Sequence, residues 1–442
     1  MKKAIRLFLV IISIIELLYS CVPAANSGSS AYSNTNNVAK TLVNEDYIYE
    51  DRIKTVLFYP SGSAATAVLN PPVVNRQSPS TLILEFDDLG KNYCNYYAKI
   101  YHFNANWTRS SYTDLQIVSD YNETLITDYT QSINTKIRYT HYRFAVPKVK
   151  LSGNYLLVVY RNGDQSDIMF SKRFIAYDPI VNITTNVQFA TDVKDRDSKQ
   201  QVDFFVSYGT NFDIVNPQDI RVVVRQNYRW DNALTINQPM YIKYDKRILD
   251  YSFFDGQNRF DGGNEYRYFD TRSLRIRGLN VDGIATNDTS NTVNLVTEGD
   301  RNSKTYSEQI DINGLYVIQR TEAQDHGIEA DYANVFFNLK VAPDFNGQVY
   351  LAGQLSNWKL IPKYQLEYEP KSGMYTTNQL LKQGFYNYQY CLVENGIPKW
   401  NYFEGDYNTT ENFYDIIVYY RPTNQFNDVV IGYTTVNYRG RN

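Results

Sequence analysis

The sequence contains few residues whose type and spacing are typical of catalysis. Ser356-Asn-Trp-Lys359 matches the bare S-x-x-K pattern of serine acylases, in which a serine nucleophile lies near a lysine. The S-D-N and K-T-G segments that accompany this pattern in such enzymes are missing from the chain. It also lacks H-E-x-x-H, G-x-S-x-G, P-loop and G-x-G-x-x-G motifs. The sequence therefore predicts a protein that is not an enzyme and binds no cofactor.

Candidate metal ligands are equally sparse. The chain has three histidines, which are far apart in the sequence: His102, His141 and His326. Asp192-x-x-Asp195-x-Asp197 and the stretch from Asp255 to Glu265 each bring several carboxylates close together, as a calcium loop does. Neither stretch fits the D-x-[DN]-x-[DN]-G loop, and basic residues intervene. We therefore expect solvated hairpin turns here and no bound metal.

The composition indicates which elements must position such residues. Of 442 residues, 41 are Tyr and 22 are Phe, against 4 Met. Aromatic and β-branched side chains favour the pleated, half-buried surface of a strand, so the composition predicts an all-β protein. The 44 basic and 47 acidic residues are interspersed and give a net charge of −3. Without a basic block to neutralise phosphates, nucleic acid is not an expected partner.

Alternating apolar runs predict strands along the whole chain after residue 45. The clearest are residues 81–86, 96–103, 153–160, 168–177, 201–208, 219–226, 336–341, 347–353, 384–390, 416–420 and 428–433. Asn162-Gly163-Asp164 predicts a hairpin, and Asp178-Pro179 predicts the end of a domain. We expect tandem β-sandwiches over 46–178 and 329–442, with a loop-rich β domain over 179–328 between them.

One strand of the middle domain carries basic residues on a single face. Arg221, Val223 and Arg225 alternate with Ile220, Val222 and Val224, so the two sets point to opposite faces. The arginines could bind an anion. A solvated sheet face is the simpler interpretation, and we adopt it here.

The N-terminus has the pattern of an exported lipoprotein. Lys2, Lys3 and Arg6 precede an apolar run that ends in Leu18-Tyr19-Ser20-Cys21, which resembles a bacterial lipobox. Residues 1–20 are therefore expected to be a signal peptide, Cys21 the lipid attachment site, and 21–45 a flexible tether. The remaining cysteines, Cys94 and Cys391, are almost 300 residues apart and are expected to be unpaired.

Val349-Tyr-Leu-Ala-Gly-Gln-Leu-Ser-Asn-Trp358 is a strand followed by a turn that carries a tryptophan. It resembles the early-set immunoglobulin-like modules found beside glycogen-binding and starch-branching enzymes, in some of which a Trp stacks on sugar rings. Trp358 is therefore a candidate glycan contact. The structural alternative, a Trp that closes the end of a sandwich, is the reading that we favour.

Three stretches together carry a wider resemblance: Gly153 to Pro179 with its Arg161-Asn-Gly-Asp turn, Val349 to Trp358, and Glu404 to Arg421 followed by Asp428 to Tyr433. In order and spacing they resemble the plug-protein family of the Bacteroidota type IX secretion system, long known as a domain of unknown function. The resemblance spans nearly the whole chain after the tether. It implies a non-catalytic subunit that closes the periplasmic end of the outer-membrane translocon barrel when no cargo is passing.

The resemblance also implies a partner and a location. The partner is the translocon barrel, and lipid on Cys21 would anchor the protein at the periplasmic face of the outer membrane; a soluble periplasmic protein is the alternative. No acidic residue follows Cys21 directly, which favours the periplasmic leaflet. Two other functions stay open, a glycan-binding lipoprotein that uses Trp358 and a secretion scaffold without gating.

Overall fold

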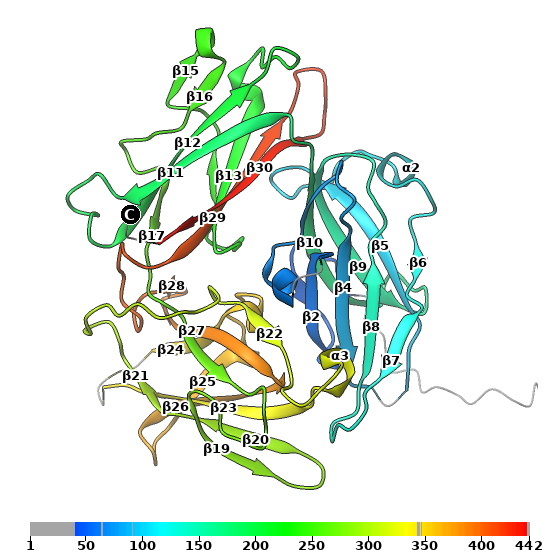
Figure 1. Cartoon of the computed structure of the whole chain (residues 1–442), viewed down its shortest axis with the longest axis vertical. Helices are drawn as coiled ribbons and strands as arrows, with labels where there is room; N and C mark the ends of the chain where they lie inside the picture. Colours follow the sequence, from blue (N-terminus) through cyan, green and yellow to red (C-terminus); the bar gives the residue numbers. More distant parts are fainter. Residues whose placement is uncertain (1–39, 63–64, 91, 343–344, 346, 440–442) are drawn as a thin grey trace, which may run out of the picture. The chain divides into compact units, whose positions relative to one another are not determined.

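A computed structural model describes residues 40–62, 65–90, 92–342, 345 and 347–439. The expected signal peptide, Cys21 and most of the expected tether lie outside these residues. Strands dominate the described chain, which confirms the all-β expectation (Figure 1). Helical elements are single turns: α2 (Asp114–Ile117), α3 (His326–Glu329), η1 (Ala65–Leu69), η2 (Pro217–Asp219), η3 (Tyr244–Lys246), η4 (Gln354–Ser356) and η5 (Pro362–Tyr364). No helix of the described residues has the length and apolarity needed to cross a membrane.

Module I packs two sheets around one core. In the first sheet the strand order is β1-β10-β9-β5-β6, with β3 beside β10. Its strands are β1 (Tyr47–Ile48), β3 (Val73–Asn75), β5 (Tyr96–Phe103), β6 (Thr124–Leu125), β9 (Gly153–Arg161) and β10 (Ile168–Tyr177). The second sheet, β2-β4-β8-β7, consists of β2 (Ile53–Pro60), β4 (Leu82–Asp88), β8 (Thr140–Ala145) and β7 (Asp128–Gln131). Phe86, Tyr96, Tyr142 and Leu157 fill the space between the sheets.

The hairpin expected at Asn162-Gly163 joins β9 to β10. Both residues have positive φ, 55° and 74°. With the bond from the Asp164 N–H to the Arg161 carbonyl, these two left-handed residues form a type I′ turn at the start of the connection over residues 162–167. The prediction of this hairpin is confirmed.

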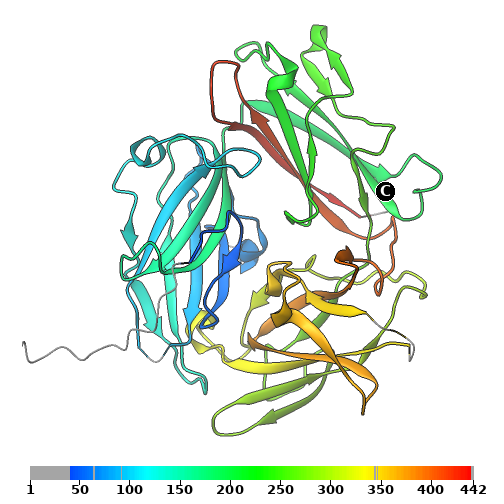
Figure 2. The ribbon, with the colours of Figure 1, turned by 180° about the vertical axis from the view of Figure 1, so that it is seen from behind.

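Module II is built from two separate segments of the chain. One sheet, β11-β12-β16-β15 with β17 beside β12, contains β11 (Val181–Phe189), β12 (Lys199–Tyr208), β15 (Tyr241–Lys243), β16 (Ile248–Asp250) and β17 (Arg259–Asp261). The other, β14-β13-β29-β30, contains β13 (Ile220–Gln226), β14 (Leu234–Ile236), β29 (Asn412–Tyr420) and β30 (Val429–Tyr438). Both views of the ribbon show the last two strands in the same sheet as β13, with β29 next to β13 and β30 beyond β29 (Figures 1 and 2). Val222, Val224, Ile416 and Val418 share the core between the sheets.

Module III is a single long sheet that bends around its own core. In the sequence it lies between the two segments that form module II. Its strand order is β18-β27-β24-β25-β26-β23-β20-β19, and β21, β22 and β28 pair at its sides. The strands are β18 (Arg267–Asp270), β19 (Val281–Thr286), β20 (Asn291–Leu295), β21 (Glu298–Gly299), β22 (Tyr316–Ile318), β23 (Tyr332–Lys340), β24 (Gln348–Ala352), β25 (Gln365–Glu369), β26 (Met374–Lys382), β27 (Gly384–Glu394) and β28 (Ile397–Lys399). Phe269, Phe337, Leu351 and Tyr388 belong to its core.

The sheets therefore divide the chain differently from the expected ranges 179–328 and 329–442. Residues 267–318 pair within module III, and residues 412–438 pair within module II. Residues 40–45, expected in the tether, contact module I: Lys40 bonds to Glu50 and Asp167. The cause is that β13 pairs with β29, which is far away in the sequence: paired Arg225 and Asp415 are 190 residues apart. A local sequence pattern does not encode pairing between such distant segments.

The expectation of a solvated face on β13 is wrong. Val223 and Arg225 are 2% and 3% exposed. Ala105 and Ile175 of module I pack with Val223 in one apolar cluster, so another module covers this face. The Arg225 guanidinium forms an ion pair with Asp415 on the neighbouring strand β29. Only Arg221 keeps the partly exposed position that the alternation predicted.

Candidate functional site

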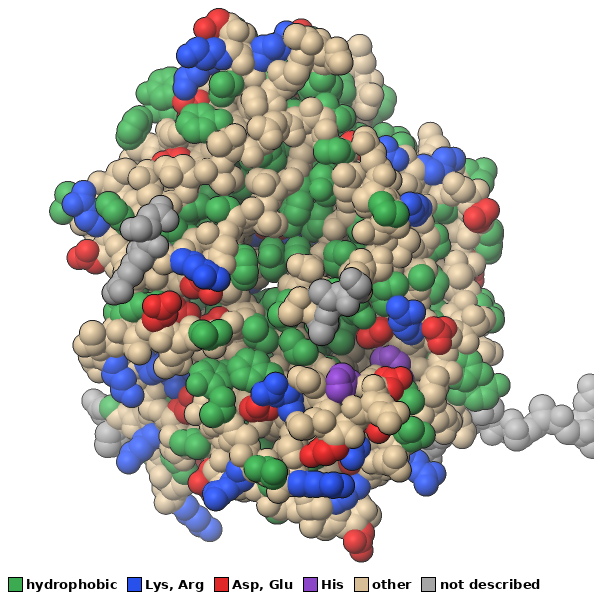
Figure 3. Space-filling model, viewed as in Figure 1, with side chains coloured by type: hydrophobic (Ala, Val, Ile, Leu, Met, Phe, Trp, Pro, Cys, Tyr) green, Lys and Arg blue, Asp and Glu red, His purple; other side chains and the backbone are tan. Residues whose placement is uncertain are grey.

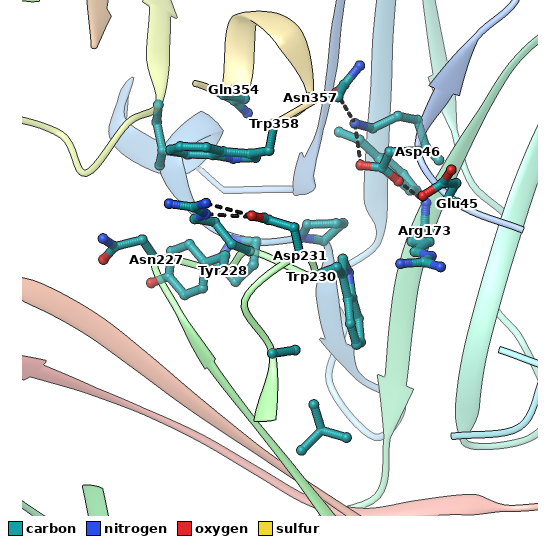
Figure 4. A pocket seen from close by; sticks show the side chains of 18 of the residues that line it. Glu45, Asp46, Arg173, Asn227, Tyr228, Trp230, Asp231, Gln354, Asn357 and Trp358 are labelled. Atoms are coloured by element: carbon teal, nitrogen blue, oxygen red, sulfur yellow. Dashed lines mark hydrogen bonds and ion pairs between the residues drawn. The ribbon is translucent and has the colours of Figure 1, made fainter. Parts of the chain in front are cut away.

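The chain has four tryptophans, and the fold brings them together. Trp107, Trp230 and Trp358 line one cavity of about 480 Å³, although they come from modules I, II and III respectively. Trp400 lies next to it, where its ring faces the same arginine as that of Trp358. Figure 4 shows the cavity with Trp230 and Trp358 on different sides. Large aromatic side chains from three modules therefore converge on one space.

The backbone around this cavity is strained. Within the described chain, the aromatic residues with positive φ are Trp107, Tyr228 and Trp358, each at 59°, and all of them line the cavity. Asn227 and Asn357 precede two of them and are also left-handed, at 52° and 48°. A bulky side chain in this region costs on the order of 1–3 kcal/mol and persists only where the surroundings impose it. Such residues cluster at functional sites.

A guanidinium lies between two of the indoles. The Arg229 Cζ atom is 4.0 Å from the Trp358 ring centroid and 4.4 Å from that of Trp400. Arg229 also pairs with Asp231 at 2.6 Å. Burial alone would lower the pKa of Arg229, but Asp231 raises it overall. One face of Trp358 is therefore covered by a permanent cation.

A second stack lies where modules I and II meet. The Trp107 and Trp230 rings meet edge to face with centroids 5.0 Å apart. The Arg173 Cζ atom is 4.0 Å from the Trp107 centroid, and the Arg225 Cζ atom is 4.3 Å from that of Trp230. Arginine over Trp is the strongest common cation–π pairing, on the order of 1–2 kcal/mol when it is shielded from water. These stacks hold the indoles in place.

The charges that line the cavity are paired with one exception. Lys172 bonds to Asp46 at 2.7 Å, and Lys359 pairs with Glu45. In the described part of the chain, Arg173 has no carboxylate partner: its Nε and Nη2 atoms donate to the Asn44 carbonyl. Burial lowers the pKa of Arg173, and Asp46 and Glu45 oppose this shift only in part. The cavity thus carries one uncompensated positive charge.

The other residues singled out from the sequence do not form a site. The Ser356 hydroxyl donates to the Gly353 carbonyl at 3.1 Å, while Lys359 pairs with Glu45, so this serine and lysine do not act on each other. Asp192 and Asp195 both contact Arg259, at 3.5 and 3.1 Å. Among the described residues no group of three or more His, Cys, Asp and Glu side chains is arranged to hold a metal.

The histidines and cysteines of the described chain form no metal-binding group either, although His141 lies close to Gly327, next to His326. Burial lowers the pKa of His102 to about 4, and its ring packs against Tyr155 in module I. His141 bonds to Asp87, and His326 begins α3. Cys94 is partly exposed and Cys391 is buried in β27; both are free thiols in the described chain. Of the two site residues expected from the sequence, Trp358 lies in the cavity and Cys21 is outside the described residues.

Two carboxyls, that of buried Asp311 and that of half-buried Asp406, should make stability depend on pH. Asp311 accepts from the backbone N–H of Tyr266, whose ring meets the edge of Trp358. Burial raises the pKa of Asp311 to about 7, and burial together with nearby Asp261 raises that of Asp406 to about 7. An unfolded aspartate titrates near 3.9, so between about pH 4 and 7 the folded state holds protons that the unfolded state has lost. The free energy of unfolding should therefore fall as pH rises through this window.

The expectation can be checked by measuring the midpoint of urea denaturation at about pH 5 and at about pH 8. The midpoint should be lower at the higher pH, because these two carboxyls bind fewer protons in the unfolded state than in the folded state. Asp406→Asn, which cannot ionise, should shrink the difference between the two midpoints. A wild-type midpoint that rises with pH, or a difference that Asp406→Asn leaves intact, would contradict the expectation.

Fold and cavity together define a multi-module β-protein with a site suited to binding. Residues 53–178, which correspond to module I after β1, match the sequence model described as "Type 9 secretion system plug protein 1st domain". No protein with curated annotation matches the chain. A crystal structure at 2.30 Å resolution of a hypothetical protein from Parabacteroides merdae ATCC 43184 superimposes with a TM-score of 0.84 at 34% identity, covering 90% of this chain and all of that one.

Residues 53–178 of the chain therefore belong to the type IX secretion system plug protein family, as its first domain. This membership associates it with type IX secretion.

Proposed function

We propose that this protein occludes the periplasmic mouth of the outer-membrane translocon barrel when no cargo is passing, and that it does no chemistry of its own. The observation that carries the proposal is the match of residues 53–178 to the first domain of plug proteins. The P. merdae protein, similar over its entire length, supports a common architecture for all the modules. The barrel is accordingly the expected partner.

The contacts between modules suit a stopper, which must resist deformation. The Lys382 ammonium of module III bonds to Asp87 of module I at 2.6 Å, and both side chains are 1% exposed. The Tyr419 hydroxyl of module II donates to Asn154 of module I at 2.7 Å. Buried polar contacts of this kind have few alternative geometries, so they favour one arrangement of the modules.

The composition of the surface is compatible with reversible binding to the barrel. On the face shown in Figure 3, charged side chains of both signs are scattered among polar and apolar ones. An interface of this composition resembles those of complexes that form and separate. We further propose that lipid on Cys21 keeps the protein at the periplasmic face of the outer membrane, where it raises the effective concentration of the stopper after displacement.

A genetic experiment tests the occluding role. Deletion of the gene should make cells permeable to large antibiotics, and a second deletion that removes the translocon barrel should restore resistance. Unchanged permeability in the single deletion, or permeability that persists without the barrel, would contradict the role. Co-purification with the barrel but no leak would instead support the scaffold alternative.

Glycan binding is the second candidate, favoured by the partly exposed Trp358 ring in the cavity. The geometry limits it, because Arg229 already covers one face of that ring at 4.0 Å. Calorimetry with a glycan panel and the Trp358→Ala variant separates the two functions. Binding that disappears in the variant would favour the glycan function, whereas the occluding role requires no glycan binding.

A further inference from the structure

The cavity that the three modules line has unused hydrogen-bond donors. The Arg173 guanidinium uses Nε and Nη2 on the Asn44 carbonyl, at 3.0 and 2.6 Å, and no bond to Nη1 is formed by the residues described. A guanidinium N–H group without a protein partner can donate to a ligand that accepts from it.

The amide at the cavity wall also presents a donor. The Gln354 Oε1 atom accepts from the Tyr316 backbone N–H at 3.0 Å. A backbone N–H can only donate, so this bond fixes the orientation of the amide and leaves its NH₂ group for another acceptor. In the same turn, the Asn357 oxygen accepts from the Lys172 ammonium at 3.2 Å. The free groups are therefore mainly donors.

The charges indicate which acceptor fits. Asp46, Glu45 and Asp231 are each neutralised by a lysine or arginine within the cavity. The Arg173 guanidinium has no such partner in the described chain, so the lining has one positive charge in excess. A ligand with a single negative charge balances it, and a carboxylate matches the planar guanidinium.

The remaining lining is apolar, and its size sets the scale of the ligand. Val56, Phe58, Pro71 and Pro72 of module I and Leu315 of module III contribute side chains to the wall. The volume of about 480 Å³ lies within the range of sites that hold ligands of several residues or of drug size. An apolar group on the ligand would bury surface against these side chains and the indoles.

We infer that this cavity binds the free C-terminus of a peptide chain that ends in a bulky apolar residue. The terminal carboxylate pairs with Arg173, the last side chain packs against the apolar wall and the indoles, and a peptide carbonyl accepts from Gln354. The inference does not depend on the occluding role. It concerns what the cavity recognises, and it holds whether or not the protein closes a barrel.

Tryptophan fluorescence and calorimetry of the purified full chain test the inference, because the cavity contains three of the four tryptophans. The probes are acetyl-Gly-Gly-Phe with a free carboxylate, the same peptide as its carboxamide, and phenylacetate. The free acid should bind at least about tenfold more tightly than the carboxamide, the loss expected for a charge-assisted hydrogen bond. Phenylacetate, which has no peptide carbonyl, should bind more weakly than the tripeptide acid.

The variants locate the site. Arg173→Gln should abolish the preference for acid over carboxamide, and Arg173→Lys should keep part of it. Arg221→Gln is the matched control, because Arg221 bonds to Asn237 away from the cavity, and it should retain the full preference. Equal binding of acid and carboxamide by the wild-type chain, or a preference that survives in Arg173→Gln, would overturn the inference. If phenylacetate bound as tightly as the tripeptide acid, the inferred contact to a peptide carbonyl would be wrong.

Discussion

Replacing Lys382 with alanine should lower the free energy of unfolding by about 3–5 kcal/mol, the cost of leaving a buried charge without its partner. Lys382 of β26 in module III bonds to Asp87 of β4 in module I at 2.6 Å. The same carboxylate accepts from the Tyr332 hydroxyl at 2.7 Å and bonds to His141 at 2.7 Å. Without Lys382, Asp87 keeps these hydrogen bonds but loses the buried ammonium that pairs with it.

The pKa of Asp87 agrees with this interpretation. Burial alone would raise it, but Lys382 and His141 lower it overall, so the carboxyl is charged in the folded protein. Its contribution to stability is therefore present above the unfolded value of about 3.9 and is lost as pH falls through the lower folded value. The loss caused by Lys382→Ala should be largest at neutral pH and should diminish in acid.

Urea denaturation of wild type and Lys382→Ala measures the difference. Lys399→Ala is the matched control, because Lys399 pairs with Glu394 at the surface, and an exposed pair contributes only about 0–1 kcal/mol. A loss in Lys382→Ala no larger than that of the control would contradict the buried contact between modules I and III.

Asp415→Ala should destabilise module II by a similar amount, about 3–5 kcal/mol, because it leaves the buried guanidinium of Arg225 without a counter-charge. The Arg225 Nε atom donates to Asp415 at 3.0 Å, and the Tyr433 hydroxyl donates to the same carboxylate at 3.1 Å. Arg225 lies on β13 and Asp415 on β29, so this pair joins the two chain segments of module II.

Hydrogen exchange shows where the loss occurs. In Asp415→Ala, amide exchange should accelerate in β11 to β14 together with β29 and β30, while the strands of module III stay protected. Arg221→Ala, on the same strand but partly exposed, should leave exchange near the wild-type rate. Acceleration confined to residues 267–399 would contradict the discontinuous construction of module II.

Much of the fold could be predicted because strand patterns are local. The expected runs 96–103 and 168–177 coincide with β5 and β10. Alternation also placed Val222 and Val224 in a core. The partner of a strand is not encoded in its own alternation, so the pairing of β13 with β29 could not be read from residues 220–226, and neither could the module that covers Val223 and Arg225.

The cavity was harder to predict for the same reason. Trp358 stood out through its local motif, whereas Trp107, Trp230 and Trp400 have no motif around them. Their rarity, four tryptophans in 442 residues, was the available signal. The left-handed backbone at Trp107 and Trp358 is imposed by tertiary packing, and a sequence without Gly at these positions gives no indication of it.

The most direct test of the occluding role is a conductance measurement on the purified translocon barrel in a planar bilayer. The open barrel should conduct steadily, and this protein, added to the periplasmic side at a stoichiometric amount, should reduce the current to that of the bare bilayer. Washing in cargo should restore it. A current that persists while the protein is bound to the barrel would contradict occlusion. It would mean that the protein attaches to the barrel but does not close it.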